Sequence, residues 1–285
     1  MPAQRPPTTL RLRRLATELR RLRAAAGLSR QDVYDHTAIN EATLYRLETA
    51  RARPQRRTLT ALLELYRVPG ESRGELYDLA RQADEQSWLQ SFPAELPTPY
   101  RTYIGFEGEA ESVVNYESLF VPGLLQTQDY ARAAVQASAP GATPDEIDRL
   151  VEARISRQTV LAREHPLQLW AIVDEGALHR PVGGPGIMRA QLEHLVSVAD
   201  LPHVTLQVVP YRVGGHPGMA GSFAILRFGD PDVDVVYVES QAAELFLEGP
   251  ADVRHFNRIV EHLRALAEPP AASVSAIAEI IREGW

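Results

Sequence analysis

The stretch that decides the fold of the first part of the chain is residues 27–48, GLSRQDVYDHTAINEATLYRLE. Gly27 suits the left-handed end of a preceding helix, and Ser29 suits the N-cap of the short helix that follows. After a turn at residues 38–39, Asn40 can cap another short helix. Two short helices joined by a tight turn predict a helix-turn-helix, a motif whose second helix lies in the major groove of DNA.

The segments on either side of this motif are predicted to complete a small bundle. In residues 10–26 leucine recurs at three- and four-residue spacing, which is typical of an amphipathic helix, at Leu12, Leu15, Leu19 and Leu22. The run LTALLELY, residues 59–66, predicts a fourth helix, and Leu76 and Leu79 mark a fifth. We therefore expect residues 1–84 to form an all-α helix-turn-helix bundle of five helices.

The helix after Asn40 turns Leu44 and Leu47 toward the bundle and leaves its polar residues for DNA. Contacts to base edges are expected from Asn40, Glu41, Ala42, Thr43 and Arg46. Contacts to phosphates are expected from Arg30, Gln31, Tyr45, Arg51, Arg53, Arg56 and Arg57, the last four of which are placed in the following loop. Simple capping by Asn40 and solvent exposure of Glu41 explain those two residues equally well. Since one such helix covers few base pairs, a homodimer on double-stranded DNA is expected.

Charge is divided unevenly along the 285 residues. Residues 1–82 contain 16 arginines and nine acidic residues, a net charge of +7, so the remainder carries −14 of the overall −7. A basic head on an acidic body suits a protein whose head approaches a polyanion. The absence of cysteine excludes disulfides and cysteine-ligated metal sites. Without a signal-peptide pattern or an apolar run of about 20 residues, a cytoplasmic location without membrane contact is expected.

Residues 19–68 resemble the Xre or lambda-repressor-like family of helix-turn-helix regulators. The family's phrase is matched by Gly27, Leu28, Ser29, Ile39, Leu44, Leu47, Glu48 and Pro54. The chain departs from the usual pattern at Arg30, Tyr34, Ala38 and Ala50. The resemblance implies a DNA-binding transcriptional regulator, and the departures leave its operator sequence open.

A connector with three prolines is predicted over residues 85–100, followed by a second domain over residues 101–285. Patterns of apolar residues predict helices at residues 126–137, 144–163, 186–200 and 251–266, and strands at residues 167–174, 204–210, 221–228 and 233–239. The segment GDPD, residues 229–232, predicts a hairpin turn between the last two strands. We therefore expect an α+β domain with a mostly antiparallel sheet and flanking helices.

Several phrases of this second part resemble the domain of unknown function that follows the Xre-type head in many actinomycete regulators, some of them described as antitoxin-like. Among them are YESLFVPGLLQTQDYARA, residues 116–133, and VTLQVVPYRVGGHPGMAGSF, residues 204–223. In that group the gene often lies beside one for a small protein. The resemblance implies a domain that binds this small partner protein or a ligand. We place the partner or ligand surface at Pro122, Gly123, Leu124, Leu125, Gln126, Gly215, His216 and Pro217, although ordinary turn chemistry also explains the glycines.

Three classes of function fit these patterns: a transcription factor that senses a small molecule, an antitoxin-like protein that mainly docks a protein partner, and an enzyme with a DNA-binding head. Glu175 and His179 form an E-x-x-x-H pair. The chain nevertheless lacks the H-E-x-x-H, G-x-x-x-x-G-K-[ST] and G-x-S-x-G motifs. We therefore expect a regulator with no catalytic residue, no metal and no cofactor.

Overall fold

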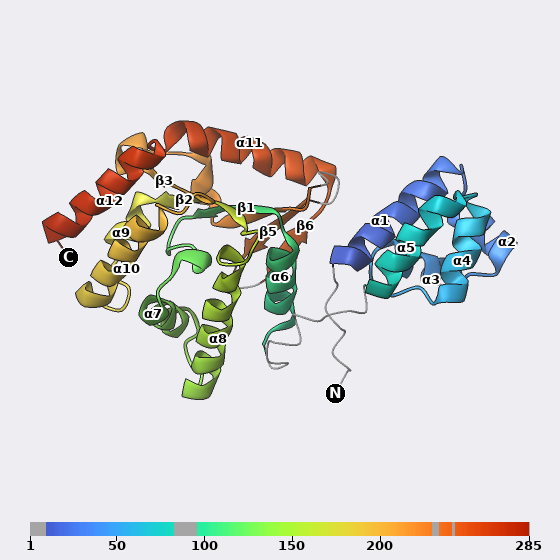
Figure 1. The fold of residues 1–285 in the computed structure, drawn as a ribbon, viewed down its shortest axis with the longest axis horizontal. Helices are drawn as coiled ribbons and strands as arrows, with labels where there is room; N and C mark the ends of the chain where they lie inside the picture. Colours follow the sequence, from blue (N-terminus) through green and yellow to red (C-terminus); the bar gives the residue numbers. More distant parts are fainter. Residues whose placement is uncertain (1–9, 83–95, 230–233, 241–242, 285) are drawn as a thin grey trace. The chain divides into compact units, whose positions relative to one another are not determined.

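The computed structural model describes residues 10–82, 96–229, 234–240 and 243–284 (Figure 1). It divides into two compact units, Met1–Phe106 and Glu107–Trp285. Most of the predicted connector lies outside the described residues, and its last three residues begin helix α6 (Thr98–Glu109). The predicted boundaries at residues 84 and 101 stay predictions. No described helix is both long and apolar enough to span a membrane.

The described part of the first unit starts with the five predicted helices, in the predicted order. They are α1 (Leu10–Ala25), α2 (Arg30–Thr37), α3 (Glu41–Glu48), α4 (Arg56–Leu65) and α5 (Gly70–Gln82). Helix α4 begins earlier than predicted, so Arg56 and Arg57 lie in its first turn and not in the preceding loop. The prediction was wrong there because the apolar period starts only at Leu59, and a polar first turn carries no periodic signal.

Local capping explains how the first unit separates its helices. Gly27 has a φ of +68°, and the Ser29 hydroxyl accepts a hydrogen bond from the Asp32 backbone N–H (3.1 Å). Ala38 ends α2 in the left-handed region, with a φ of 55°, and its N–H donates to the Tyr34 carbonyl (2.8 Å). The helices then enclose an apolar core, formed by Leu15, Leu19, Val33, Leu44, Leu47, Leu59, Leu62, Leu63, Tyr66, Val68 and Leu76.

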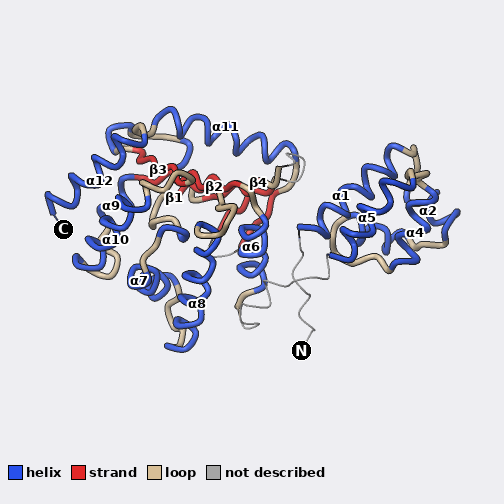
Figure 2. Tube along the Cα trace, viewed as in Figure 1, coloured by secondary structure: helices blue, strands red, loops and turns tan. Residues whose placement is uncertain are grey.

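A six-stranded mixed sheet forms the centre of the second unit's described residues (Figure 2). The strands are β1 (Ser112–Glu117), β2 (Gln168–Asp174), β3 (Val204–Val209), β4 (Phe223–Arg227), β5 (Val235–Glu239) and β6 (Glu244–Leu247), in the order β3-β2-β1-β4-β5-β6. The pairs β1–β2 and β2–β3 are parallel, and the three other neighbouring pairs are antiparallel. The predicted α+β class with a mostly antiparallel sheet is therefore confirmed.

Helices cover both faces of this sheet (Figure 1). They are α7 (Gln128–Ser138), α8 (Pro144–Ser156), α9 (Glu175–His179), α10 (Pro185–Val198), α11 (Pro250–Leu266) and α12 (Pro270–Gly284). Figure 1 shows α11 on one face and α7, α8 and α10 on the other. Val114 and Tyr116 of β1 share an apolar cluster with Val260 and Leu263 of α11. Helix α12 packs against β3 and α10.

Several second-unit elements differ from the predictions. Strands β1 and β6 and helices α9 and α12 were not predicted, and the helix expected at residues 144–163 ends at Ser156 and continues as a 3-10 helix. Strand β1 mixes polar with apolar residues, so its central place depends on neighbours far away in the sequence. Strands β4 and β5 are antiparallel neighbours as expected, but residues 230–232 of the predicted hairpin turn lie outside the described residues.

Candidate nucleic-acid interface

Helix α3 presents one apolar and one polar face. Leu44 and Leu47 are buried in the core of the first unit, at 0% and 2% exposure. The opposite face is exposed at Asn40, Glu41, Ala42, Tyr45 and Arg46 and half-buried at Thr43. The predicted base-contact residues therefore lie together on the outer side of the helix, while the two leucines hold that helix against the bundle.

Hydrogen bonds order the polar face of α3. The Asn40 Oδ1 accepts a hydrogen bond from the backbone N–H of Ala42 (2.8 Å), so the asparagine caps the helix. One turn later, Arg46 Nη2 donates to the Thr43 Oγ1 (3.2 Å). This bond lays the Arg46 guanidinium along the exposed surface of α3. The capping role explains Asn40 without DNA, and a base contact by this residue stays a prediction.

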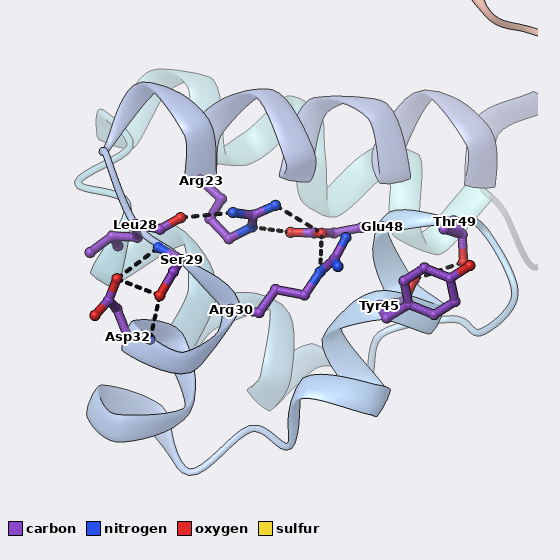
Figure 3. Close-up of polar contacts among 8 residues, drawn as sticks. All are labelled: Arg23, Leu28, Ser29, Arg30, Asp32, Tyr45, Glu48 and Thr49. Atoms are coloured by element: carbon purple, nitrogen blue, oxygen red, sulfur yellow. Dashed lines mark hydrogen bonds and ion pairs between the residues drawn. The ribbon is translucent and has the colours of Figure 1, made fainter.

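A buried glutamate at the end of α3 joins three helices (Figure 3). The Glu48 side chain is 0% exposed. Its carboxylate forms ion pairs with Arg23 of α1 (Nε–Oε1 2.5 Å, Nη2–Oε2 3.2 Å) and with Arg30 of α2 (Nε–Oε2 3.0 Å). Arg23 Nη1 also donates to the Leu28 carbonyl (2.7 Å), and the hydrogen bond to Glu48 raises the pKa of Arg23. Because both arginines bind one carboxylate, α3 is fixed relative to α1 and α2.

Tyr45 lies beside two of the arginines predicted to bind phosphates. The guanidinium carbons of Arg30 and Arg51 are 5.2 and 5.5 Å from the centre of the Tyr45 ring. Cation–π contacts of this kind restrain long side chains. Arg30 is thus held by Glu48 and Tyr45 together, whereas Arg51 follows α3 on an exposed turn. The tyrosine therefore places two positive charges next to the polar face of α3.

The other predicted phosphate contacts occupy less uniform positions. Gln31 is exposed, and its side-chain amide donates to Asp35 (2.8 Å). Arg53 is half-buried, whereas Arg56 and Arg57 are exposed at the start of α4. The structure leaves their contacts with DNA as predictions.

Comparison with known families separates the chain into the same two parts. A helix-turn-helix domain model matches residues 14–76. A second model, described as a domain of unknown function, DUF5753, matches residues 100–279, which is more than half of the chain. The chain belongs to the DUF5753 family. Its helix-turn-helix domain indicates DNA binding. Comparisons with curated proteins and with solved structures found no match.

In the DUF5753 domain, the first segment predicted to meet a partner is mostly buried. Leu124, Leu125 and Gln126 are at most 5% exposed, and Pro122 is also buried. A Cβ atom on Gly123 would stand 2.5 Å from Arg157 Nη2, so this turn is packed directly on the guanidinium. The prediction that these side chains form an exposed docking surface is therefore wrong, because Pro122, Leu124, Leu125 and Gln126 are buried. This turn packs against α8 and α10.

The second predicted segment also belongs to the DUF5753 domain. Residues 217–220 pack against α11. Gly215 and Pro217 are exposed, whereas the His216 side chain is only 5% exposed and lies 3.1 Å (Nε2–Oδ2) from Asp174. The E-x-x-x-H pair is also formed, with His179 Nε2 3.3 Å from Glu175 Oε1 on α9. Contact of Gly215 or Pro217 with a partner stays a prediction.

The sequence interpretation missed the roles of Arg23 and Glu48. A signal was present for Glu48, because position 48 shares the inward stripe of α3 with Leu44 and Leu47. A glutamate on such a stripe is buried, and a buried carboxylate is costly unless a positively charged side chain is paired with it. No local pattern names the cation, since Arg23 and Arg30 are 25 and 18 residues away.

Proposed function

We propose that this protein is a sequence-specific DNA-binding transcriptional regulator of the Xre or lambda-repressor-like type. The observation that carries the proposal is the exposed polar face of α3, which Leu44, Leu47 and Glu48 attach firmly to the bundle. A rigid helix with an outward polar side can enter the major groove without rearrangement. The net charge of +7 over residues 1–82 supports the same function, because it draws this unit toward a polyanion.

Within this proposal the residues of α3 divide into two roles. Arg46 reads a base, since an arginine can donate two hydrogen bonds to guanine O6 and N7. Glu41, Ala42 and Thr43 meet base edges at the start of the helix. Arg30 and Arg51, spaced by Tyr45, bind phosphates and supply affinity without sequence preference. We further propose a homodimer on half-sites about 34 Å apart, one turn of DNA.

We propose that the second domain controls this regulator by binding a small molecule, and not by catalysis. The second candidate function of this domain is antitoxin-like docking of a small partner protein, and two exposed side chains favour it. Tyr211 and Met219, on one loop, are 61% and 69% exposed. Large exposed apolar side chains of this kind are enriched at protein interfaces.

The test begins with selection of a preferred site from random DNA, followed by gel-shift titrations. Arg46→Ala should weaken binding to that site by about 1–3 kcal/mol and relax the preference at one base pair. Arg20→Ala is the matched control, because it removes the same charge from an exposed position on α1. Wild-type affinity and preference in both Arg46→Ala and Glu41→Ala would contradict the assignment of α3.

A further inference from the structure

Residues 210–222, here called the crossover loop, pass over the carboxyl ends of two parallel strands. The loop leaves β3 at the edge of the sheet and must pass β2 and β1 to reach β4. Strands β1, β2 and β3 run in parallel, and Phe223 at the start of β4 pairs with Tyr116 near the end of β1. The loop therefore crosses where β1 and β2 finish, the end at which open sheets hold ligands.

Two buried polar atoms in this region have no hydrogen-bond partner among the described residues: the Tyr116 hydroxyl and His216 Nδ1. Tyr116 is 0% exposed and the His216 side chain 5% exposed. Their rings meet edge to face, with centroids 6.2 Å apart. Because buried polar groups in proteins almost always have a partner, two unpartnered groups on adjoining rings indicate a position for a ligand atom.

The hydrogen-bonding capacity of the two groups follows from their neighbours. His216 Nε2 lies 3.1 Å from Asp174 Oδ2, so this nitrogen carries the proton and Nδ1 is an acceptor in the neutral ring. Burial, with the charges of Asp174 and Glu117, raises the pKa of Tyr116. The phenol therefore keeps its O–H as a donor. Together the two groups offer one donor and one acceptor.

Apolar groups form part of the surroundings of this pair. Gly218 of the crossover loop lies on the Tyr116 ring, since a Cβ atom at this position would stand 2.5 Å from Tyr116 Cζ. The Phe223 ring is 5.8 Å from the Tyr116 ring, and Val209 and Val213 belong to the same apolar cluster. A ligand held by Tyr116 and His216 would thus have its remaining atoms against apolar side chains.

We propose that the carboxyl ends of β1 and β2, under the crossover loop, bind a small uncharged molecule that carries an amide or hydroxyl group on an apolar body. An amide accepts from the Tyr116 O–H through its oxygen and donates to His216 Nδ1 through its nitrogen, and a hydroxyl does both with one atom. A carboxylate has no proton to donate and is repelled by Asp174. The site deepens the proposed small-molecule control of the regulator.

Three probes that share a phenyl ring test this chemistry on the full chain: benzamide, benzyl alcohol and benzoate. Their binding is followed by NMR of 15N-histidine-labelled protein, in which His216→Asn identifies the His216 signal. Benzamide or benzyl alcohol should shift the Nδ1 resonance saturably, and benzoate should bind about tenfold more weakly or not at all. Equal binding of benzoate, or the absence of a saturable shift with both neutral probes, would overturn the proposal.

Tyr116→Phe separates a binding role from a structural one. The variant loses no protein hydrogen bond, so its stability to urea without ligand should equal or exceed that of the wild type, while its affinity for benzamide falls about tenfold. Tyr237→Phe is the matched control, because its hydroxyl donates to Glu244 (2.9 Å): stability should fall and probe binding should stay unchanged. Wild-type benzamide affinity in Tyr116→Phe would refute the site. DNA is absent from this test, so its failure leaves the DNA-binding proposal intact.

Discussion

Glu48 in the first unit is buried and Glu117 in the second is half-buried, and the partners of the two carboxylates differ. Glu48 binds the guanidinium groups of Arg23 and Arg30. Glu117, at the end of β1, accepts hydrogen bonds from the Asn115 amide (3.3 Å) and from Ser222. Burial raises the pKa of Glu117 to about 7, and the hydrogen bonds and the more distant charge of Arg154 only partly oppose this shift.

The difference matches what each unit is proposed to contact. A polyanion is recognised from outside, so the first unit uses a buried anion to anchor arginines around an exposed helix. A small molecule binds within a domain, and in the second unit polar side chains lie together at the ends of strands. Because its hydrogen-bond partners are neutral, the Glu117 carboxyl changes protonation near neutral pH. The Glu48 carboxylate is paired with two guanidinium groups, and its role is to hold the helices together.

The largest effect is expected from removal of the paired glutamate. Glu48→Ala leaves Arg23 and Arg30 without their carboxylate and should lower the free energy of unfolding by about 3–5 kcal/mol, measured by urea denaturation. Glu41→Ala, at an exposed position on the same helix, should change it by less than about 0.5 kcal/mol. A small effect at both positions would show that the ion pairs are not what attaches α3.

A pH series tests the other half of the comparison. The folded-state pKa of Glu117, about 7, is above the ordinary value of 4.5, so the folded protein binds this proton more tightly than the unfolded chain. The resulting stability is fully present below pH 4.5 and lost as the pH rises through 7. Between pH 5 and 8 the free energy of unfolding of the wild type should fall by about 2 kcal/mol more than that of Glu117→Gln. Glu152→Gln, an exposed change on α8, should follow the wild type, and parallel curves for all three proteins would contradict the prediction.

The smallest effect concerns the backbone turn between α2 and α3. Ala38 has a φ of 55°, a conformation that costs a residue with a Cβ roughly 1 kcal/mol. Ala38→Gly should therefore raise the free energy of unfolding by up to about 1 kcal/mol, and Ala61→Gly, within α4, should lower it by a similar amount. If calorimetry finds Ala38→Gly less stable, the left-handed turn is not a source of strain in the first unit.

Local sequence signals determined most of the first unit. The caps at Gly27, Ser29 and Asn40 act within three residues of their own positions, and the leucine spacing describes one helix at a time. Such interactions can be predicted from one sequence, and the spacing of Leu44 and Leu47 likewise predicted which face of α3 packs against the bundle. Strands β2 and β3 were predicted for the same reason, because each contains a run of apolar residues that is visible within a short window.

Only the tertiary structure decided which residues meet. It placed the unpredicted β1 at the centre of the sheet, buried Leu124 and Leu125, joined Arg23 and Arg30 to Glu48, and set Tyr116 beside His216. The Asn115 amide, for example, donates to the Phe223 carbonyl across 108 residues of sequence. Partners so far apart are selected by the packing of the whole domain, and no pattern within a short window specifies them.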